Sequence, residues 1–207
     1  MPVAALVMAG GKGSRLGRGE KPLVEVSGKP MIQHVVDSLK ACKEIRRIIV
    51  AISSDTPKTA LIAKKLGAEI VETEGLGYVE DLRYAIMKLG LRETIVVSAD
   101  MPCIRPETLS FVIAHFTSYS KAALSIMVPI SEYRRIWIEP ETIFNIEGMD
   151  VAPAGVNMLD GNAMNGSELE QENLIVHDAE TLINVNTAKD LAVAGRILSK
   201  SLLNSVS

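Results

Sequence analysis

A glycine-rich and basic segment runs from Gly10 to Lys21, directly after a short apolar stretch near the start of the chain. Around it the sequence reads Met8-Ala9-Gly10-Gly11-Lys12-Gly13-Ser14-Arg15-Leu16-Gly17. Glycines bring successive backbone N–H groups close to a phosphate, where a side chain would obstruct the approach. Lys12, Arg15 and Lys21 add positive charge, so the segment is a candidate phosphate-binding loop.

The spacing of this loop differs from that of two better-known nucleotide-binding loops. A P-loop has Lys-Ser or Lys-Thr after its last glycine, whereas here Gly13 is followed by Ser14 and Arg15. The GxGxxG dinucleotide fingerprint fails because Gly17 falls one residue late and no helix is signalled there. Glycine and lysine content alone leaves open a flexible turn whose basic residues are merely solvated.

Asp100 ends a second apolar stretch and is followed by Met-Pro. In nucleotidyl transfer an anionic acceptor approaches the α-phosphorus of a triphosphate while negative charge accumulates on the leaving pyrophosphate. A carboxylate-bound Mg²⁺ at the same sheet edge as a basic loop offsets that repulsion. An Asp after a strand also serves as a turn or helix cap. Together with the loop, Asp100 predicts magnesium-dependent nucleotidyl transfer.

Glycines and carboxylates also gather at an expected helix start, at Gly77, Glu80 and Asp81. Guanine presents N1–H and N2–H donors, and a carboxylate or a backbone carbonyl is the matching acceptor. These three residues are therefore candidates for contact with the base or the ribose. Acids favoured by the helix dipole are the structural alternative for Glu80 and Asp81.

The first half of the chain must place these residues with alternating strands and helices, which predicts a parallel sheet with crossover helices. Apolar periodicity predicts strands at residues 3–8, 47–52, 69–72 and 94–98, and helices at residues 31–41, 57–66 and 78–89. We therefore expect an α/β fold, a three-layer α/β/α sandwich with a mostly parallel central sheet of the Rossmann-like kind.

The second half of the chain has a mixed pattern. We expect a helix over residues 106–116, a strand over 122–129, an irregular and turn-rich segment over 131–150, an exposed loop over 160–172, a strand over 174–176 and a helix over 187–198. Because no repeat or long linker interrupts the chain, one nucleotidyltransferase domain over residues 1–198 is expected. Residues 199–207 are polar enough to fray.

Composition narrows the class of protein. The 207 residues are 47% hydrophobic, enough for one continuous core. A formal charge of -3 predicts no general attraction to nucleic acid or to anionic membranes. Cys42 and Cys103 suggest neither a disulfide framework nor a zinc site. With no signal peptide and no apolar run of the length a membrane span needs, we expect a cytoplasmic protein.

The order Gly-Gly-x-Gly-x-Arg, followed by Lys21-Pro22-Leu23, resembles the signature of the MobA-like nucleotidyltransferases, which share the nucleotide-diphospho-sugar transferase fold. Residues 183–191 are similar to the closing N-x-N-T-x-x-D-L pattern of that family. The resemblance implies that Asn186 joins Asp100 at the metal and that Asn184 lies in the substrate pocket. For Asp190, a capping box with Thr187 is the expected role. The nucleotide is assigned to Met8, Ala9, Gly10, Gly11, Lys12, Gly13, Arg15, Lys21, Gly77, Glu80 and Asp81, and catalysis to Lys12, Arg15, Lys21 and Asp100.

Residues 8–13, 77–82, 153–157 and 184–187 together resemble, more narrowly, the archaeal GTP:adenosylcobinamide-phosphate guanylyltransferases. This resemblance implies GTP and adenosylcobinamide phosphate as substrates, in the making of coenzyme B12. It also places Gly155 and Asn157 in the substrate pocket, although Pro153-Ala154-Gly155 taken alone fits an ordinary turn. Molybdenum-cofactor guanylyltransferase and sugar-1-phosphate nucleotidyltransferase are rival enzymes, and a GTP-binding regulator is the rival that is not an enzyme.

Several conspicuous side chains are left out of the predicted site. His34, His115 and His177 belong to no base or metal constellation, and an acceptor phosphate needs no general base because it is already an anionic nucleophile. Trp137, after two arginines, fits the border of a bulky acceptor, a homodimer interface or plain packing equally well.

Overall fold

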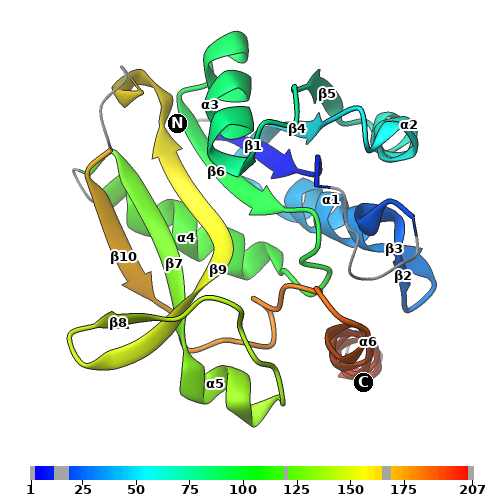
Figure 1. Cartoon of the computed structure of the whole chain (residues 1–207), viewed down its shortest axis with the longest axis vertical. Coiled ribbons are helices and arrows are strands. Elements are labelled where there is room, and N and C mark those ends of the chain that lie inside the picture. Colours follow the sequence, from blue (N-terminus) through cyan, green and yellow to red (C-terminus); the bar gives the residue numbers. More distant parts are fainter. Residues whose placement is uncertain (1–2, 12–18, 119–120, 165–168, 205–207) are drawn as a thin grey trace.

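The computed structural model describes residues 3–11, 19–118, 121–164 and 169–204, and it is built around one mixed sheet (Figure 1). The strand order is β10-β7-β9-β6-β1-β4-β5, and β8 pairs with β9 off this path. The strands are β1 (Val3–Met8), β4 (Ile45–Ile52), β5 (Glu69–Glu72), β6 (Glu93–Ser98), β7 (Ala123–Pro129), β8 (Phe144–Ile146), β9 (Met149–Asp160) and β10 (Gln171–Ile175). A separate small hairpin joins β2 (Glu25–Val26) and β3 (Lys29–Pro30).

Most strand pairs in the sheet are parallel. Strand β1 pairs in parallel with β4 and β6, β4 with β5, and β7 with β10. The exception is β9, which runs antiparallel to β6, β7 and β8. The predicted α/β fold with a mostly parallel central sheet is therefore confirmed, and one long antiparallel strand is inserted in its middle.

Helices cover both faces of this sheet. They are α1 (Met31–Ala41), α2 (Pro57–Lys65), α3 (Tyr78–Leu89), α4 (Pro106–Ser118), α5 (Ile130–Arg135) and α6 (Ala188–Asn204). Successive residues of β1 point to opposite faces, so Ala5 and Val7 enter the core beneath α1, α4 and α6, whereas Leu6 enters the core beneath α3. Figure 1 shows α3 in front of the sheet, with α1 and α4 behind it.

Two expectations for the second half need correction, and the turn considered as an alternative for residues 153–155 is excluded. Residues 131–150 are not irregular throughout, because they contain most of α5, all of β8 and the start of β9. Pro153-Ala154-Gly155 is not a turn but lies inside β9, next to a register shift between Ser125 and Met127 of β7. Helix α6 continues to Asn204 instead of ending near residue 198. In the part of the chain that the structure describes, no helix is long and apolar enough to cross a membrane.

Candidate active site

The candidate site lies at the carboxyl ends of β1 and β6, which are neighbours in the sheet. These strands run in parallel with Met8 opposite Ser98, so the residues that follow them emerge at the same edge. The backbone N–H of Ala99 donates to the carbonyl of Met8, at 3.1 Å between nitrogen and oxygen. Gly10 and Asp100 are thereby brought to one edge, as their positions after apolar stretches predicted.

The start of the glycine-rich loop is held by the residue that follows β4. The hydroxyl of Ser53, which is buried, donates to the carbonyl of Gly10 at 2.7 Å and accepts from the N–H of Asp55 at 3.2 Å. This contact orients the backbone at Gly10 toward the sheet edge. The predicted residues Lys12, Gly13 and Arg15 lie outside the described residues, so their assignment to the triphosphate stays a prediction.

A pocket of about 440 Å³ opens beside this loop, and we call it the nucleotide-side pocket. Its walls combine the loop with the segment before α3 and the end of β6. It is lined by Met8, Ala9, Gly10, Gly11, Lys21, Pro22, Asp55, Gly75, Gly77, Tyr78, Asp81, Ser98, Ala99 and Asp100. The structure therefore gathers the described nucleotide residues of the prediction into one cavity. Glu80 is the exception, since it is exposed and absent from this lining.

Asp81 lines this pocket, but its carboxylate is already engaged by the protein backbone and is not a free acceptor for a base. Its side chain is buried, and its Oδ1 accepts from the backbone N–H groups of Gly75 at 3.1 Å and Leu76 at 3.4 Å. The carboxylate thereby holds the loop before α3 in place. Gly77, with φ of +137°, completes a backbone path that residues with side chains rarely adopt.

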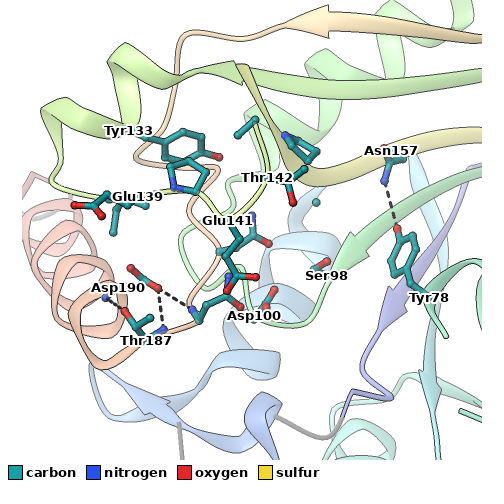
Figure 2. A pocket seen from close by; sticks show the side chains of 17 residues that line it. Tyr78, Ser98, Asp100, Tyr133, Glu139, Glu141, Thr142, Asn157, Thr187 and Asp190 are labelled. Atoms are coloured by element: carbon teal, nitrogen blue, oxygen red, sulfur yellow. Dashed lines mark hydrogen bonds between the residues drawn. The ribbon is translucent and has the colours of Figure 1, made fainter. Parts of the chain in front are cut away.

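A second pocket, of about 400 Å³, lies on the other side of Asp100, and we call it the acceptor-side pocket. It is lined by Tyr78, Ser98, Asp100, Tyr133, Ile138, Glu139, Pro140, Glu141, Thr142, Ala152, Pro153, Gly155, Asn157, Asn184, Asn186, Thr187 and Asp190. Figure 2 shows Tyr78 and Asn157 at one end of this pocket and Glu139 at the other, with Asp100 between them. The predicted substrate-pocket residues Gly155, Asn157, Asn184 and Asn186 therefore share one cavity.

At Gly155, β9 passes close to the closing segment of the chain. A Cβ atom on Gly155 would stand 2.7 Å from Oδ1 of Asn184 and 3.2 Å from Oγ of Ser98, and the backbone there has φ of +76°. The Nδ2 of Asn184 donates to the carbonyl of Ala154 at 2.9 Å. Glycine is required here both by the close approach and by the left-handed backbone.

Tyr78, Ser98 and Asp100 line both pockets, so the pockets meet at these three residues. The hydroxyl of Tyr78 accepts from Nδ2 of Asn157 at 3.3 Å (Figure 2). Although the residue as a whole is 45% exposed, its hydroxyl is turned into the pocket. Desolvation raises the pKa of Tyr78, the hydrogen bond from Asn157 opposes the rise, and the charge of Asp100 adds to it.

Three predicted residues from distant parts of the chain meet at the junction. The Nζ of Lys21, in the short 3₁₀ helix η2 (Lys21–Leu23), donates to Oδ2 of Asp100 and, at 2.6 Å, to Oδ1 of Asn186. The backbone N–H of Val185 donates to the carbonyl of Asp100 at 2.9 Å. This bond fixes the segment that carries Asn186 against the end of β6.

The expected capping box at the start of α6 is confirmed. Oδ2 of Asp190 accepts from the backbone N–H groups of Asn186 at 2.9 Å and Thr187 at 2.8 Å, and Oγ1 of Thr187 accepts from the N–H of Asp190 at 3.2 Å (Figure 2). Asp190 thus supports the site through the backbone of Asn186 and does not itself reach into the contact with Lys21.

Sequence reasoning missed several residues of the site. Tyr78 and Ser98 lay within motifs already considered. The position of Tyr78 at a helix start and of Ser98 at a strand end could have marked both as site residues. Residues 138–142 were hidden in a stretch interpreted as irregular. Glu20, which precedes Lys21, accepts from the N–H groups of Lys58 at 2.9 Å and Thr59 at 2.6 Å and so ties this segment to α2. Nothing in the local sequence indicates that contact.

Residues 5–158 match the family of the MobA-like NTP transferase domain, so the chain belongs to that family and is a nucleotidyltransferase. It is 31% identical over 206 residues to adenosylcobinamide-phosphate guanylyltransferase of Methanocaldococcus jannaschii, covering 95% of this chain and 97% of the relative. It is 29% identical over 204 residues to a protein of Pyrococcus horikoshii named "Probable molybdenum cofactor guanylyltransferase", covering 93% and 99%. The solved CMP:2-keto-3-deoxy-manno-octonic acid synthetase, complexed with CTP, shares the fold, with a TM-score of 0.80 at 16% identity over 97% of this chain and all of that one.

Proposed function

We propose that this nucleotidyltransferase transfers GMP from GTP to adenosylcobinamide phosphate, giving adenosylcobinamide-GDP and pyrophosphate. The observation that carries the proposal is that two separate pockets, each large enough for part of a substrate, meet at Asp100. The similarity of nearly the whole chain to a guanylyltransferase with this acceptor supports the choice of substrates.

In this reaction an oxygen of the acceptor phosphate bonds to the α-phosphorus of GTP while the bond from that phosphorus to the pyrophosphate oxygen breaks. The nucleophile is already an anion, so no side chain has to remove a proton. The work of the protein is to hold two anions in line and to offset their repulsion. Lys21, with Lys12 and Arg15 from the glycine-rich loop, is proposed to neutralise the triphosphate.

The oxygens at the pocket junction fit a hard divalent cation. Oδ1 of Asp100 is buried and accepts no hydrogen bond from the residues that the structure describes, and Oδ1 of Asn186 contacts the same ammonium as Asp100. No group of three or more His, Cys, Asp or Glu side chains suited to a metal occurs among the described residues. Mg²⁺ suits such a site, because it takes few protein oxygens and completes its shell with water and substrate phosphates. When bound there, Mg²⁺ would supply charge neutralisation at the α-phosphate.

Guanine recognition is proposed for the loop before α3. Gly75 and Gly77 line the nucleotide-side pocket, and Asp81 holds the backbone between them. Backbone groups held in this way can accept from N1–H and N2–H of guanine while Asp81 stays committed to the loop. A base with the opposite pattern would leave groups unpaired, which is a strong source of discrimination.

The acceptor-side pocket has chemistry that suits a cobinamide. Glu139, Glu141 and Asn157 line it with hydrogen-bond acceptors, which match the N–H donors of the carboxamide groups on a corrinoid. Trp137 directly precedes residues 138–142 of this lining and is 72% exposed, so plain packing does not account for it. The border of a bulky acceptor and a homodimer interface remain the two predictions for Trp137.

Molybdenum-cofactor guanylyltransferase is the second candidate function. The relative from Pyrococcus horikoshii is nearly as similar to this chain and is covered over 99% of its length. Both activities would use the same nucleotide-side pocket, so they differ only in what the acceptor-side pocket binds.

The test offers the protein GTP, ATP, CTP or UTP with adenosylcobinamide phosphate, molybdopterin or a sugar 1-phosphate, and follows pyrophosphate release. Release should require Mg²⁺, GTP and adenosylcobinamide phosphate together. Asp100→Asn should lower the rate by about a hundredfold or more. Asp37→Asn, which alters an exposed ion pair with Lys29, should not. Release with molybdopterin but not with the corrinoid would move the assignment to the second candidate.

A further inference from the structure

The side chain of Lys21 lies where the proposed metal ligands converge. Its ammonium contacts Oδ2 of Asp100 and Oδ1 of Asn186, which are 79 and 165 residues away in the sequence. The side chains of Lys21 and Asp100 are only 19% and 17% exposed. A cation of the protein itself therefore occupies the Asn186 oxygen and one Asp100 oxygen, and it leaves only the buried Oδ1 of Asp100 for a divalent ion.

Backbone contacts hold both sides of this arrangement. On one side, Pro22 is buried after Lys21, and the carboxylate of Glu20 accepts two backbone N–H groups at the start of α2. On the other side, the N–H of Val185 is bonded to the carbonyl of Asp100. The ammonium is therefore delivered from an anchored segment to anchored acceptors, and only the flexible lysine stem is free to redirect it.

A divalent ion cannot share this position with the ammonium. Two like charges within a few ångströms repel strongly, and solvent screens them weakly where side chains are mostly buried. A metal that binds Asp100 and Asn186 must first displace Lys21. Without an alternative partner, the displaced ammonium would lose two charge-assisted hydrogen bonds.

We propose that Lys21 is an internal counter-cation that closes the Asp100–Asn186 site to divalent metal until a nucleoside triphosphate draws the ammonium away. The inference rests on the proposed function, which places the triphosphate in the nucleotide-side pocket that Lys21 also lines. Triphosphate oxygens supply the alternative partner, so metal and nucleotide enter together. By linkage, each ligand then raises the affinity for the other. Lys21 is thereby a positioning residue for the metal as well as a ligand of the phosphates.

The test measures Mn²⁺ binding to nucleotide-free protein by the loss of the free Mn²⁺ signal in electron paramagnetic resonance. Lys21→Met should bind Mn²⁺ about tenfold or more tightly than the parent protein, because a repelling charge is gone. Lys21→Arg keeps the charge and should bind as weakly as the parent. Lys29→Met removes a lysine from an exposed ion pair and should also match the parent. Lys21→Gln provides a second uncharged variant should the methionine variant fold poorly.

Two further measurements separate this inference from the proposed function. First, the gain in Mn²⁺ affinity of Lys21→Met should vanish in the double variant that adds Asp100→Asn. Second, when GTP is present, Lys21→Met should bind Mn²⁺ more weakly than the parent does. If Lys21→Met and the parent bind Mn²⁺ equally well without nucleotide, the proposed role of Lys21 as a counter-cation is wrong. If Asp100→Asn still weakens Mn²⁺ binding in the presence of GTP, the metal site survives that result. If Asp100→Asn changes nothing with GTP present, the metal site itself is wrong.

Discussion

Replacement of Gly155 by alanine tests the account of how β9 meets the closing segment of the chain. The new Cβ would stand 2.7 Å from Oδ1 of Asn184, whereas ordinary contact begins near 3.4 Å. Asn184 must therefore move, and its hydrogen bond to the carbonyl of Ala154 is lost, at a cost of about 1 kcal/mol. The left-handed backbone, with φ of +76°, adds about 1–2 kcal/mol for a residue with a side chain.

The sum is about 2–3 kcal/mol, which for a chain of this size lowers Tm by roughly 4–12 °C. Gly148→Ala is the matched control, because Gly148 has φ of +85° but a Cβ there would meet nothing within 4 Å. Gly148→Ala should lose only the stability that the left-handed backbone costs a residue with a side chain, about 1–2 kcal/mol. Scanning calorimetry measures both variants, and Gly155→Ala should also raise KM for the acceptor while Gly148→Ala leaves it unchanged. Equal Tm values for the two variants would refute the contact with Asn184.

Three other predictions test single contacts, the first with a matched control. Asp190→Ala removes the acceptor for two N–H groups at the start of α6, so the free energy of unfolding should fall by about 1–2 kcal/mol. The kcat should also drop, because the backbone of Asn186 is no longer held in place. Asp178→Ala is the control, because it loses a similar bond to the N–H of Thr181 away from Asp100, and it should lower stability but not kcat. A normal kcat in both variants would show that Asp190 does not position Asn186. Tyr78→Phe should raise KM for the acceptor. Because burial raises the pKa of Tyr78 above its ordinary value of 10, the hydroxyl stays protonated near neutrality, and the variant should keep the parent's pH–rate profile up to about pH 9. The hydrogen bonds from Arg47 lower the pKa of Glu69, so this pair stabilises the fold above the unfolded pKa near 4.3 and loses its effect as pH falls through the folded pKa. The pair is exposed, so Arg47→Met should cost only a few tenths of a kcal/mol at pH 7, and thermal unfolding should show a smaller difference as the pH is lowered towards 3.

Local pattern was sufficient for the elements that carry the nucleotide-side pocket. The bounds of β1, β5, α1 and α3 agree with the prediction residue for residue, because the two helices have a clear period of 3.6 residues and the two strands are short β-rich runs. The rule that parallel strands end at one sheet edge was also enough to place Gly10 beside Asp100 from the sequence.

Local pattern failed at β9. Pro153 and Gly155 read as turn residues, yet Ala152, Ala154, Val156 and Met158 alternate into the core between two neighbouring strands. Burial of this face and pairing with β6 and β7 outweighed the local preference, and the register shift opposite Ser125 and Met127 accommodates the two residues. The acceptor-side pocket depends on this strand, which is why its walls were predicted only in part.

The residue types by themselves determined a basic glycine-rich loop, a strand-end carboxylate and a capped closing helix, because each depends on neighbours within a few positions. Only the tertiary structure decided that Lys21 meets Asp100 and Asn186, that Glu20 caps α2 and that Asp81 is committed to the loop before α3. The first two contacts join residues far apart in the chain. They depend on which elements lie side by side in the folded sheet, and no spacing in the sequence encodes that order.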